Sequence, residues 1–293
     1  MALQAKAVTV LEVIQKSTAY LEKKGVASAR LQSELLLAHV CKLPRLQLYL
    51  NFERNLGEPE LEQMRELVRR RGAREPLQHL IGSVSFCGLE LQVGRQALIP
   101  RPETELLAEK CWEYLSKLQE PAPAVLDFGT GTGCLAIAVA SHCPTARVWA
   151  TDISAEAIEL ARANAARHQL EGRIQFFCGD GFAAIPEPVL FDLIVSNPPY
   201  IPSAEIAGLE PEVRDYDPRI ALDGGADGLD FYRRLAAEGM DWLKGGGRLM
   251  VELGDGQAGA VRELFEAKKW VVESVQNDYS GKARVLEASR ARK

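Results

Sequence analysis

The sequence lacks the features that mark membrane-spanning or secreted proteins. No apolar run in its 293 residues approaches the roughly 18 residues of a membrane span. At the start, MALQAKAVTVLEVIQ is interrupted by Glu12 before the apolar region of a signal peptide can form, so we expect no secretion and no membrane partner. The composition, 47% hydrophobic and 26% charged, is that of an ordinary soluble globular protein.

Cysteine and histidine are sparse and poorly spaced for metal binding. None of the six cysteines forms a CxxC pair, and the four histidines form no ligand-like cluster with them. Scattered thiols in a reducing compartment fit this spacing better than a disulfide framework or a zinc site. We therefore expect a cytoplasmic protein without a metal ion.

Positive charge is scarce in the larger part of the chain. Residues 84–293 hold 22 Lys and Arg against 31 Asp and Glu, whereas residues 1–83 hold 13 against 9. This excess of negative charge argues against non-specific binding to the phosphate backbone of nucleic acids, so we expect no direct nucleic-acid partner. The one dense basic run, RRRGAR with Arg70, Arg71 and Arg74, fits either a solvated helix end stopped by Gly72 or a docking site.

The chain from residue 1 to residue 75 predicts helices alone. Apolar residues recur at three- and four-residue steps in TVLEVIQKSTAYLEKKG, SARLQSELLLAHVCKL, LPRLQLYLNF and PELEQMRELVRRRG, with Ser28 as a candidate N-cap. Four short helices suffice for a small bundle. From 76 to 100, apolar alternation broken by glycines predicts a hairpin or an extended linker. We predict a helical domain over 1–83, a hairpin or linker over 84–97 and a further domain over 98–293.

From residue 103 onward, helical and strand patterns alternate. The predicted strands are AVLDF, ARVWATD, RIQFFCGD, FDLIVSN, GRLMVELG, WVVESVQND and ARVLEAS, with helices such as SAEAIELARANAARHQL and LDFYRRLAAEGMDWLK between them. This alternation predicts a doubly wound α/β fold with a mostly parallel sheet. The last two strands, joined by YSGK, could pair as a hairpin.

A glycine loop follows the first of these strands, in VLDFGTGTGCLAIA. Gly129, Gly131 and Gly133 allow a sharp turn and a close approach of the backbone to a ligand at a helix N-terminus. A dinucleotide fingerprint would need glycine where Cys134 stands, and no Gly-Lys-Ser/Thr follows for a phosphate-binding P-loop. Asp127, just before the glycines, suits a ligand with a positive group, although a tight turn without a ligand is an alternative.

Two acids end the next two predicted strands. Asp152, in VWATDIS, is placed to accept both hydroxyls of a ribose, although it could instead cap the following helix. Asp180, in FFCGDGF, could accept from an adenine amino group, with Phe182 or Ile153 packing on the ring. Ligands of open α/β sheets bind at the carboxyl ends of strands, so the loop and the two acids predict one site.

With these three features, residues 98–293 resemble the class I S-adenosylmethionine-dependent methyltransferases. NPPY at 197–200 is similar to the signature of enzymes that methylate a planar NH2 group. The nitrogen of such a group is a poor nucleophile because its lone pair is delocalised. The Asn197 side-chain oxygen and the Pro198 carbonyl can accept its two hydrogens and favour the positive charge that develops on it. Pro199 stiffens the turn, and Tyr200 can stack on the flat group.

Other segments resemble the peptide chain release factor glutamine N5-methyltransferases, the HemK/PrmC family. These segments are PLQHLIG, LIPRPETE, NPPYIP and DPRIALDGGADGLDFYRRL, together with the helical N-terminal part. The resemblance implies a seven-stranded Rossmann-like domain that transfers a methyl group from S-adenosyl-L-methionine, leaving S-adenosyl-L-homocysteine, without a metal. It implies as substrate the glutamine of the Gly-Gly-Gln loop of bacterial class I release factors, recognised by the helical domain of a monomeric enzyme.

The resemblance also assigns residues. Those expected to bind the cofactor are Asp127, Phe128, Gly129, Thr130, Gly131, Thr132, Gly133, Asp152, Ile153, Asp180, Gly181, Phe182 and Asn197. Those expected to bind the substrate are Arg101, Glu103, Asn197, Pro198, Pro199 and Tyr200, of which Asn197, Pro198 and Tyr200 serve catalysis. Position 181 is Gly where the family often has Trp, and His79 stands where Tyr is common.

Several residues and functions stay open from sequence alone. Arg101 and Glu103 could line the pocket or tie the linker to the catalytic domain, and Glu252 and Gln257 fit structural or rim positions. Asp223, Asp227 and Asp230 fit turn and cap positions better than catalytic ones. One alternative function is an N6-adenine DNA or RNA methyltransferase. Another is a non-catalytic S-adenosylmethionine-binding module of the translation machinery, and a hydride-transferring enzyme would leave NPPY unexplained.

Overall fold

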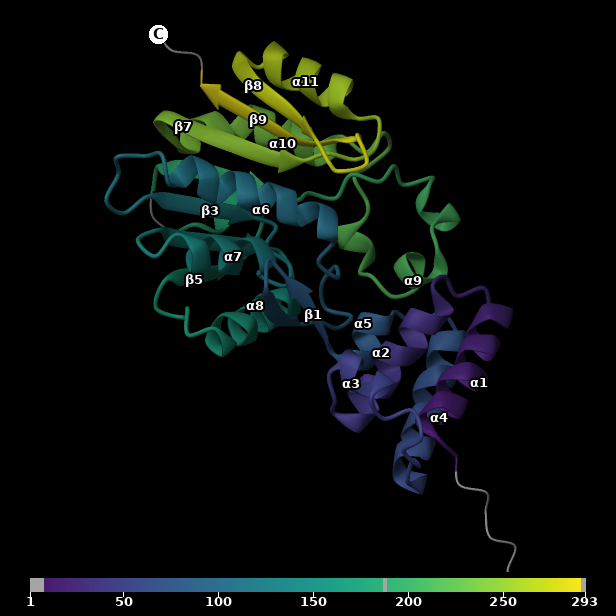
Figure 1. The fold of residues 1–293 in the computed structure, drawn as a ribbon. Coiled ribbons are helices and arrows are strands. Elements are labelled where there is room, and N and C mark those ends of the chain that lie inside the picture. The colour runs from purple at the N-terminus through teal and green to yellow at the C-terminus, as the bar shows by residue number, and fades with distance from the viewer. Residues whose placement is uncertain (1–7, 187–188, 291–293) are drawn as a thin grey trace, which may run out of the picture. The chain divides into compact units, whose positions relative to one another are not determined.

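The computed structural model describes residues 8–186 and 189–290 (Figure 1). The first seven residues, part of the segment in which we expect no signal peptide, lie outside the described chain. Two compact units are present. One comprises the chain up to Gly82 together with Glu210–Tyr216, and the other comprises Ser83–Leu209 together with the chain from Asp217 onward. Within the described residues, no helix is both long and apolar enough to cross a membrane.

The first unit is helical. Its helices are α1 (Val10–Lys23), α2 (Ala29–Cys41), α3 (Arg45–Tyr49), α4 (Glu58–Gly72), α5 (Leu77–Ile81) and α9 (Pro211–Arg214). Helix α1 begins with a capping box, in which the Thr9 hydroxyl accepts from the Glu12 amide and the Glu12 carboxylate accepts from the Thr9 amide. One face of α1 carries Val10, Ile14 and Leu21 into a core shared with α2 and α4.

Two local predictions for this unit were wrong. Ser28 does not cap α2, because its backbone is left-handed (φ 51°) and its side chain makes no cap hydrogen bond. Residues 77–81 form the short helix α5 rather than extended chain. The rigid Pro76 starts α5, and Gly82, with φ 84°, ends it. The predicted hairpin begins directly after it, with β1 (Ser83–Phe86) paired to β2 (Leu89–Gln92).

The basic run at the end of α4 is not a solvated helix end. The Arg71 side chain is 5% exposed, and its guanidinium donates to Glu212 Oε1 at 2.6 Å and to Gln32 Oε1 at 2.5 Å. Arg74 donates to the same Glu212 oxygen at 2.7 Å and to Glu210 at 2.6 Å. The run therefore binds a segment of its own chain, Glu210–Tyr216, which belongs to this unit.

The second unit contains a seven-stranded sheet of order β5-β4-β3-β6-β7-β9-β8. Its strands are β3 (Ala124–Phe128), β4 (Arg147–Asp152), β5 (Ile174–Cys178), β6 (Phe191–Ser196), β7 (Leu243–Glu252), β8 (Trp270–Asn277) and β9 (Ala283–Arg290). The first five strands in this order are parallel, and β9 is antiparallel to both β7 and β8. The predicted α/β sheet and its terminal hairpin are confirmed.

Helices cover both faces of this sheet. They are α6 (Pro102–Leu115), α7 (Cys134–His142), α8 (Ala155–Arg167), α10 (Asp230–Glu238) and α11 (Ala258–Ala267). Helices α6, α7 and α8 share one core with Val125 of β3, whereas α10 and α11 share the other with its neighbour Leu126. Successive residues of a strand point to opposite faces, and because both faces are covered, β3 is buried along its whole length.

The helix predicted over residues 229–244 is shorter than its pattern suggests. Helix α10 ends at Glu238, a 3₁₀ turn spans Gly239–Trp242, and β7 begins at Leu243. A Cβ atom on Gly239 would lie 3.0 Å from the Leu249 side chain, so the turn packs closely on the sheet. Close packing of this kind depends on the tertiary fold and has no periodic signal in the sequence.

Candidate active site

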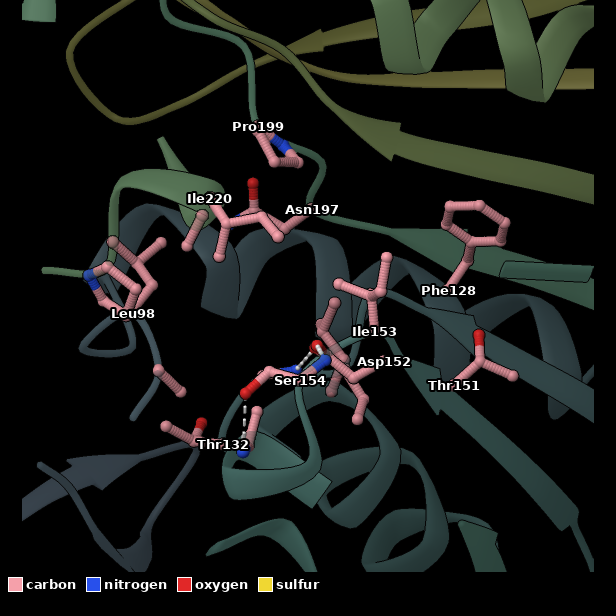
Figure 2. A pocket seen from close by; sticks show the side chains of 18 of the residues that line it. Leu98, Phe128, Thr132, Thr151, Asp152, Ile153, Ser154, Asn197, Pro199 and Ile220 are labelled. Atoms are coloured by element: carbon pink, nitrogen blue, oxygen red, sulfur yellow. Dashed lines mark hydrogen bonds between the residues drawn. The ribbon is translucent and has the colours of Figure 1, made fainter. Parts of the chain in front are cut away.

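A cavity in the second unit lies at the carboxyl ends of β3, β4 and β6. Strand order reverses between β3 and β6, because the chain proceeds from β3 to β4 and β5 on one side and from β6 to β7 on the other. Such switch points are the usual ligand sites of open α/β sheets. The sequence-predicted residues that line the cavity are Arg101, Phe128, Gly129, Thr130, Gly131, Thr132, Asp152, Ile153, Asp180, Gly181, Asn197 and Pro199. Figure 2 shows Asn197 and Pro199 across the cavity from Asp152 and Ser154.

The glycine loop lines the cavity through its backbone. Gly129 and Gly131 have φ of 78° and 55°, values that other residues adopt only with strain. The amides of Gly129 and Thr130 both donate to the Thr151 carbonyl at 2.9 Å. These two hydrogen bonds fix the loop to the end of β4.

Asp127 lies beneath this loop and does not line the cavity. Its carboxylate is fully buried and accepts from the Thr130 hydroxyl at 2.6 Å and from the Ala136 amide at 3.0 Å. Burial raises the pKa of Asp127 to about 7, against the effect of these two hydrogen bonds. The carboxylate joins the loop to the start of α7, and the expected contact between Asp127 and the ligand stays a prediction.

Asp152 is held in place by the backbone around it. Its Oδ2 accepts from the Gly131 amide at 2.8 Å, and its Oδ1 accepts from the Ser154 amide at 2.9 Å. The cap of α8 is Ser154, whose hydroxyl accepts from the Ala157 amide. Asp152 is therefore not the N-cap of α8. Its carboxylate lines the cavity beside the half-exposed Ile153 side chain (Figure 2).

The side chains that line the cavity near Asp180 are not all the ones we expected. The Phe182 ring does not line the cavity. It is 2% exposed and stacks on Trp242, with ring centroids 5.4 Å apart. Phe128 and Arg234 line the cavity instead; Arg234 pairs with the Asp180 carboxylate and lies over the Phe128 ring, 5.6 Å from its centroid. Phe182 is drawn inward because two aromatic rings bury it on the α10 side of the sheet.

The NPPY segment brings only part of its residues to the cavity. Asn197 and Pro199 line it, whereas Pro198 is buried and Tyr200 is packed against the core around α10 and α11. Burial and the nearby Glu252 raise the pKa of Tyr200 to about 12, so its hydroxyl stays protonated. The expected stacking of Tyr200 on a target group has no counterpart among the lining residues.

Two hydrogen bonds in series connect the Asn197 side chain to Thr104 and Glu252. Its Nδ2 donates to the Thr104 hydroxyl oxygen at 3.1 Å, and the Thr104 hydroxyl donates to Glu252 Oε2 at 2.6 Å. Sequence reasoning missed Thr104 and assigned Glu252 only a structural or rim position. A carboxylate at the end of the apolar strand RLMVELG was the one signal that could have drawn attention to Glu252.

The loop after NPPY is tied to the glycine-rich segment ALDGGADGL. The Ile201 amide donates to the Leu222 carbonyl at 3.0 Å, and the Gly224 amide donates to the Ile201 carbonyl at 2.9 Å. Gln257 adds a bond from its side-chain amide to the Tyr200 carbonyl at 2.8 Å, which gives it a structural position. Asp223 and Asp227 accept from the backbone amides of Gly225 and Leu229, as turn residues do.

Arg101 and Glu103 have different surroundings. Arg101 lines the cavity and donates to Asp217 at 2.5 Å, whose side chain is fully buried. Glu103 is exposed and does not line the cavity. The segment DPRIALDGGADGL adds the lining residues Pro218, Ile220 and Ala221, to which the sequence assigned no individual role. Gln96, Ala97, Leu98 and Pro100 line the cavity before Arg101. Across residues 8–186 and 189–290, no group of three or more His, Cys, Asp or Glu could hold a metal ion.

Comparison with known proteins defines the class. The model of the PrmC N-terminal domain matches residues 12–82, and that of the methyltransferase small domain matches residues 110–208. The solved human methyltransferase 10 domain containing protein is similar in fold, with a TM-score of 0.51 and 14% identity, over 70% of this chain and 90% of that chain. The second unit therefore has the Rossmann-like fold of the class I methyltransferases, and an all-helical domain precedes it.

Curated relatives define the family more narrowly. The release factor glutamine methyltransferase of Geobacter sulfurreducens is 48% identical over 257 residues, 88% of each chain. That of Chlorobaculum tepidum is 41% identical over 94% of this chain and 96% of the relative. The chain belongs to the release factor glutamine methyltransferase family.

Proposed function

We propose that this protein methylates the side-chain amide nitrogen, N5, of the glutamine in the Gly-Gly-Gln motif of bacterial class I release factors. The observation that carries the proposal is that Asn197 lines the same cavity as the glycine loop and Asp152. Relatives that match 88% and 94% of this chain are named release factor glutamine methyltransferase. An acceptor for an amide NH2 group and a cofactor site thus occupy one cavity.

The cavity fits S-adenosyl-L-methionine as methyl donor. When bound, this cofactor supplies an electrophilic methyl group on a sulfonium and needs no metal. Asp152 would accept from ribose hydroxyls, because each of its oxygens is oriented by one backbone amide and keeps capacity for a further bond. Phe128 and Ile153 offer apolar surface for the adenine ring, and Asp180 lies beside them.

The NPPY residues act on the glutamine. Asn197 Oδ1 and the Pro198 carbonyl would accept the two hydrogens of the substrate NH2 group and so orient its nitrogen. These acceptors stabilise the positive charge that develops on nitrogen as the N–CH3 bond forms and the S–CH3 bond breaks. The nitrogen then releases one proton to water. The two prolines limit the motion of the acceptors, so little reorganisation is needed.

The remaining assignments belong to the same proposal. The helical unit, with its basic balance, recognises the release factor, and residues 98–293 carry catalysis. The enzyme acts as a monomer in the cytoplasm, without direct nucleic-acid binding and without a metal. The paired Arg71 and Arg74 do not belong to the docking surface, because Glu210 and Glu212 already bind them.

The test uses methyl-labelled S-adenosyl-L-methionine with three acceptors in parallel. These are an unmodified release factor, the same factor with its Gly-Gly-Gln glutamine changed to Ala, and duplex DNA. Label on the first acceptor alone supports the proposal, and label on DNA alone assigns the function to a nucleic-acid methyltransferase. Asn197→Ala is expected to lower kcat about 100-fold or more while the variant stays folded. Near-wild-type turnover by that variant contradicts the proposed clamp.

A further inference from the structure

Three residues from separate elements form a hydrogen-bonded chain that runs from the cavity wall, which Asn197 and Thr104 line, to the buried Glu252. Asn197 follows β6, Glu252 ends β7, and Thr104 lies in the first turn of α6. Strands β6 and β7 are parallel with Ser196 opposite Val251, so Asn197 and Glu252 are the next residues in register. The Thr104 and Glu252 side chains are each 1% exposed, so water does not compete for their hydrogen bonds.

The direction of these hydrogen bonds follows from the donors available. An ionised Glu252 can only accept, so the single hydroxyl hydrogen of Thr104 is donated to it. The Thr104 oxygen can then only accept from Asn197, which must present its NH2 group. Turning the Asn197 amide over would place its oxygen against an oxygen with no hydrogen to give. The side-chain oxygen of Asn197 is therefore directed away from Thr104.

We propose that Glu252 is a positioning residue that acts through Thr104 to fix the amide of Asn197, with Oδ1 as the atom offered to the substrate amide. This inference rests on the proposed function, because only an NH2 substrate requires an acceptor at that position. Glu252 does not touch the substrate. Glu252 determines whether the oxygen or the nitrogen of the Asn197 amide faces the substrate.

Protonation of Glu252 would remove the constraint. A carboxylic acid can donate to Thr104, and Thr104 can then donate to Asn197, which lets the amide turn its NH2 group toward the cavity. The Asn197 NH2 group would then face the hydrogens of the substrate NH2 group and could not accept hydrogen bonds from them. The ionised form of Glu252 is thus the competent one, and activity falls as pH falls through its pKa.

The groups around Glu252 determine the pH at which its carboxylate becomes protonated. Burial raises its pKa to about 7, and the exposed Glu103 also raises it. The hydroxyls of Thr104 and Tyr200 and the cation of Arg284 on β9 act in the opposite direction. Tyr232 of α10 donates to the Glu252 main-chain carbonyl, not to its carboxylate. The transition therefore falls in a range that kinetic assays can reach.

The first test is the pH dependence of kcat with the release factor as substrate. Wild-type kcat is expected to fall about tenfold per pH unit below a midpoint near 7. Glu252→Gln should lose this acidic limb, because its side-chain amide has no proton to titrate in this pH range. Thr104→Ser should keep the limb, whereas Thr104→Val should lower kcat roughly 100-fold. Asp255→Asn, a surface carboxylate paired with Lys282, is the control expected to match the wild type.

A spectroscopic readout separates this inference from the proposed function. The ¹⁵N signal of the Asn197 side-chain amide should titrate near pH 7 in wild type and Thr104→Ser, and not in Glu252→Gln or Thr104→Val. This signal does not depend on turnover, so it decides the inference even if the release factor is not methylated. An acidic limb in Glu252→Gln equal to that of the wild type, or an amide signal that titrates without Thr104, overturns it.

Discussion

Gly228 lies directly against the carbonyl oxygen of Tyr200. A Cβ atom at residue 228 would be 2.3 Å from that oxygen, and the φ of Gly228 is +76°. The Gln257 side-chain amide donates to the same Tyr200 carbonyl at 2.8 Å. Only glycine satisfies both the conformation and the space at this position. The glycines of ALDGGADGL therefore support the NPPY turn by close backbone packing.

Gly228→Ala is accordingly expected to displace the NPPY turn. A left-handed backbone costs a non-glycine residue about 1–2 kcal/mol, and the clash with Tyr200 adds to this. We expect unfolding free energy to fall by at least that amount and kcat to fall more than KM changes, measured by urea denaturation and methyl transfer. Gly208→Ala is the matched control, because Gly208 has no neighbour within 4 Å of a Cβ atom. Equal effects of the two substitutions would contradict the argument.

The pair of Arg71 and Glu212 is expected to stabilise the helical unit. Their side chains are 5% and 20% exposed, and the bond length is 2.6 Å. Glu212→Gln removes the carboxylate partner of the buried Arg71 guanidinium and should cost roughly 3 kcal/mol. Arg71→Met should cost less, because Arg74 still donates to Glu212. A double-mutant cycle in urea should give a coupling of about 1–3 kcal/mol. The exposed pair of Arg69 and Glu66, on the same helix, should give a clearly smaller coupling, because water screens it.

Gly181 is expected to tolerate no aromatic residue. A Cβ atom there would lie 2.4 Å from the Phe128 ring, and the φ of Gly181 is +56°. Gly181→Trp must push Phe128 out of the cavity wall, and overpacking of this kind costs about 1–3 kcal/mol. The Kd for S-adenosyl-L-methionine, measured by titration calorimetry, should rise about tenfold. Adding Phe128→Ala should recover part of the loss, and an unchanged Kd in the single variant would refute this packing argument.

Local patterns in the sequence predicted much of the fold and of the cavity. The glycine loop, Asp152 and Asn197 each stand at the end of an apolar strand pattern, and parallel strands bring such ends to one edge of a sheet. All three features line the cavity. Periodicity and turn chemistry act over a few residues, which is why these positions could be found without a structure.

Contacts between distant parts of the chain could not be predicted in this way. Arg71 and Glu212 are 141 positions apart, and Thr104 and Glu252 are 148 apart. Phe182 follows Asp180 as an adenine-contacting residue would, yet two other aromatic rings bury it. The position of such a side chain depends on which residues from distant parts of the chain pack into the same core. Short stretches of sequence do not contain this information.

Asp127 is expected to make the stability of the catalytic unit depend on pH. Its pKa is raised from 3.8 to about 7 in the folded state, mainly by burial. Between these values the folded chain holds a proton that the unfolded chain has released, so unfolding free energy falls as pH rises through this range. At about 1.4 kcal/mol per pH unit, the loss attributable to this group amounts to roughly 4 kcal/mol above the upper value.

Asp127→Asn isolates that contribution, because Thr130 and Ala136 both donate to one oxygen of Asp127, which the amide oxygen can replace, and the amide has no proton to titrate. Relative to the wild type, the variant should gain stability steadily from about pH 4 to about pH 7 and then level off. Urea unfolding of both proteins across this range measures the difference. Because Glu252 titrates in both proteins, its contribution cancels. A difference that stays constant with pH would show that Asp127 is ionised in the folded state, with its hydrogen bonds outweighing its burial.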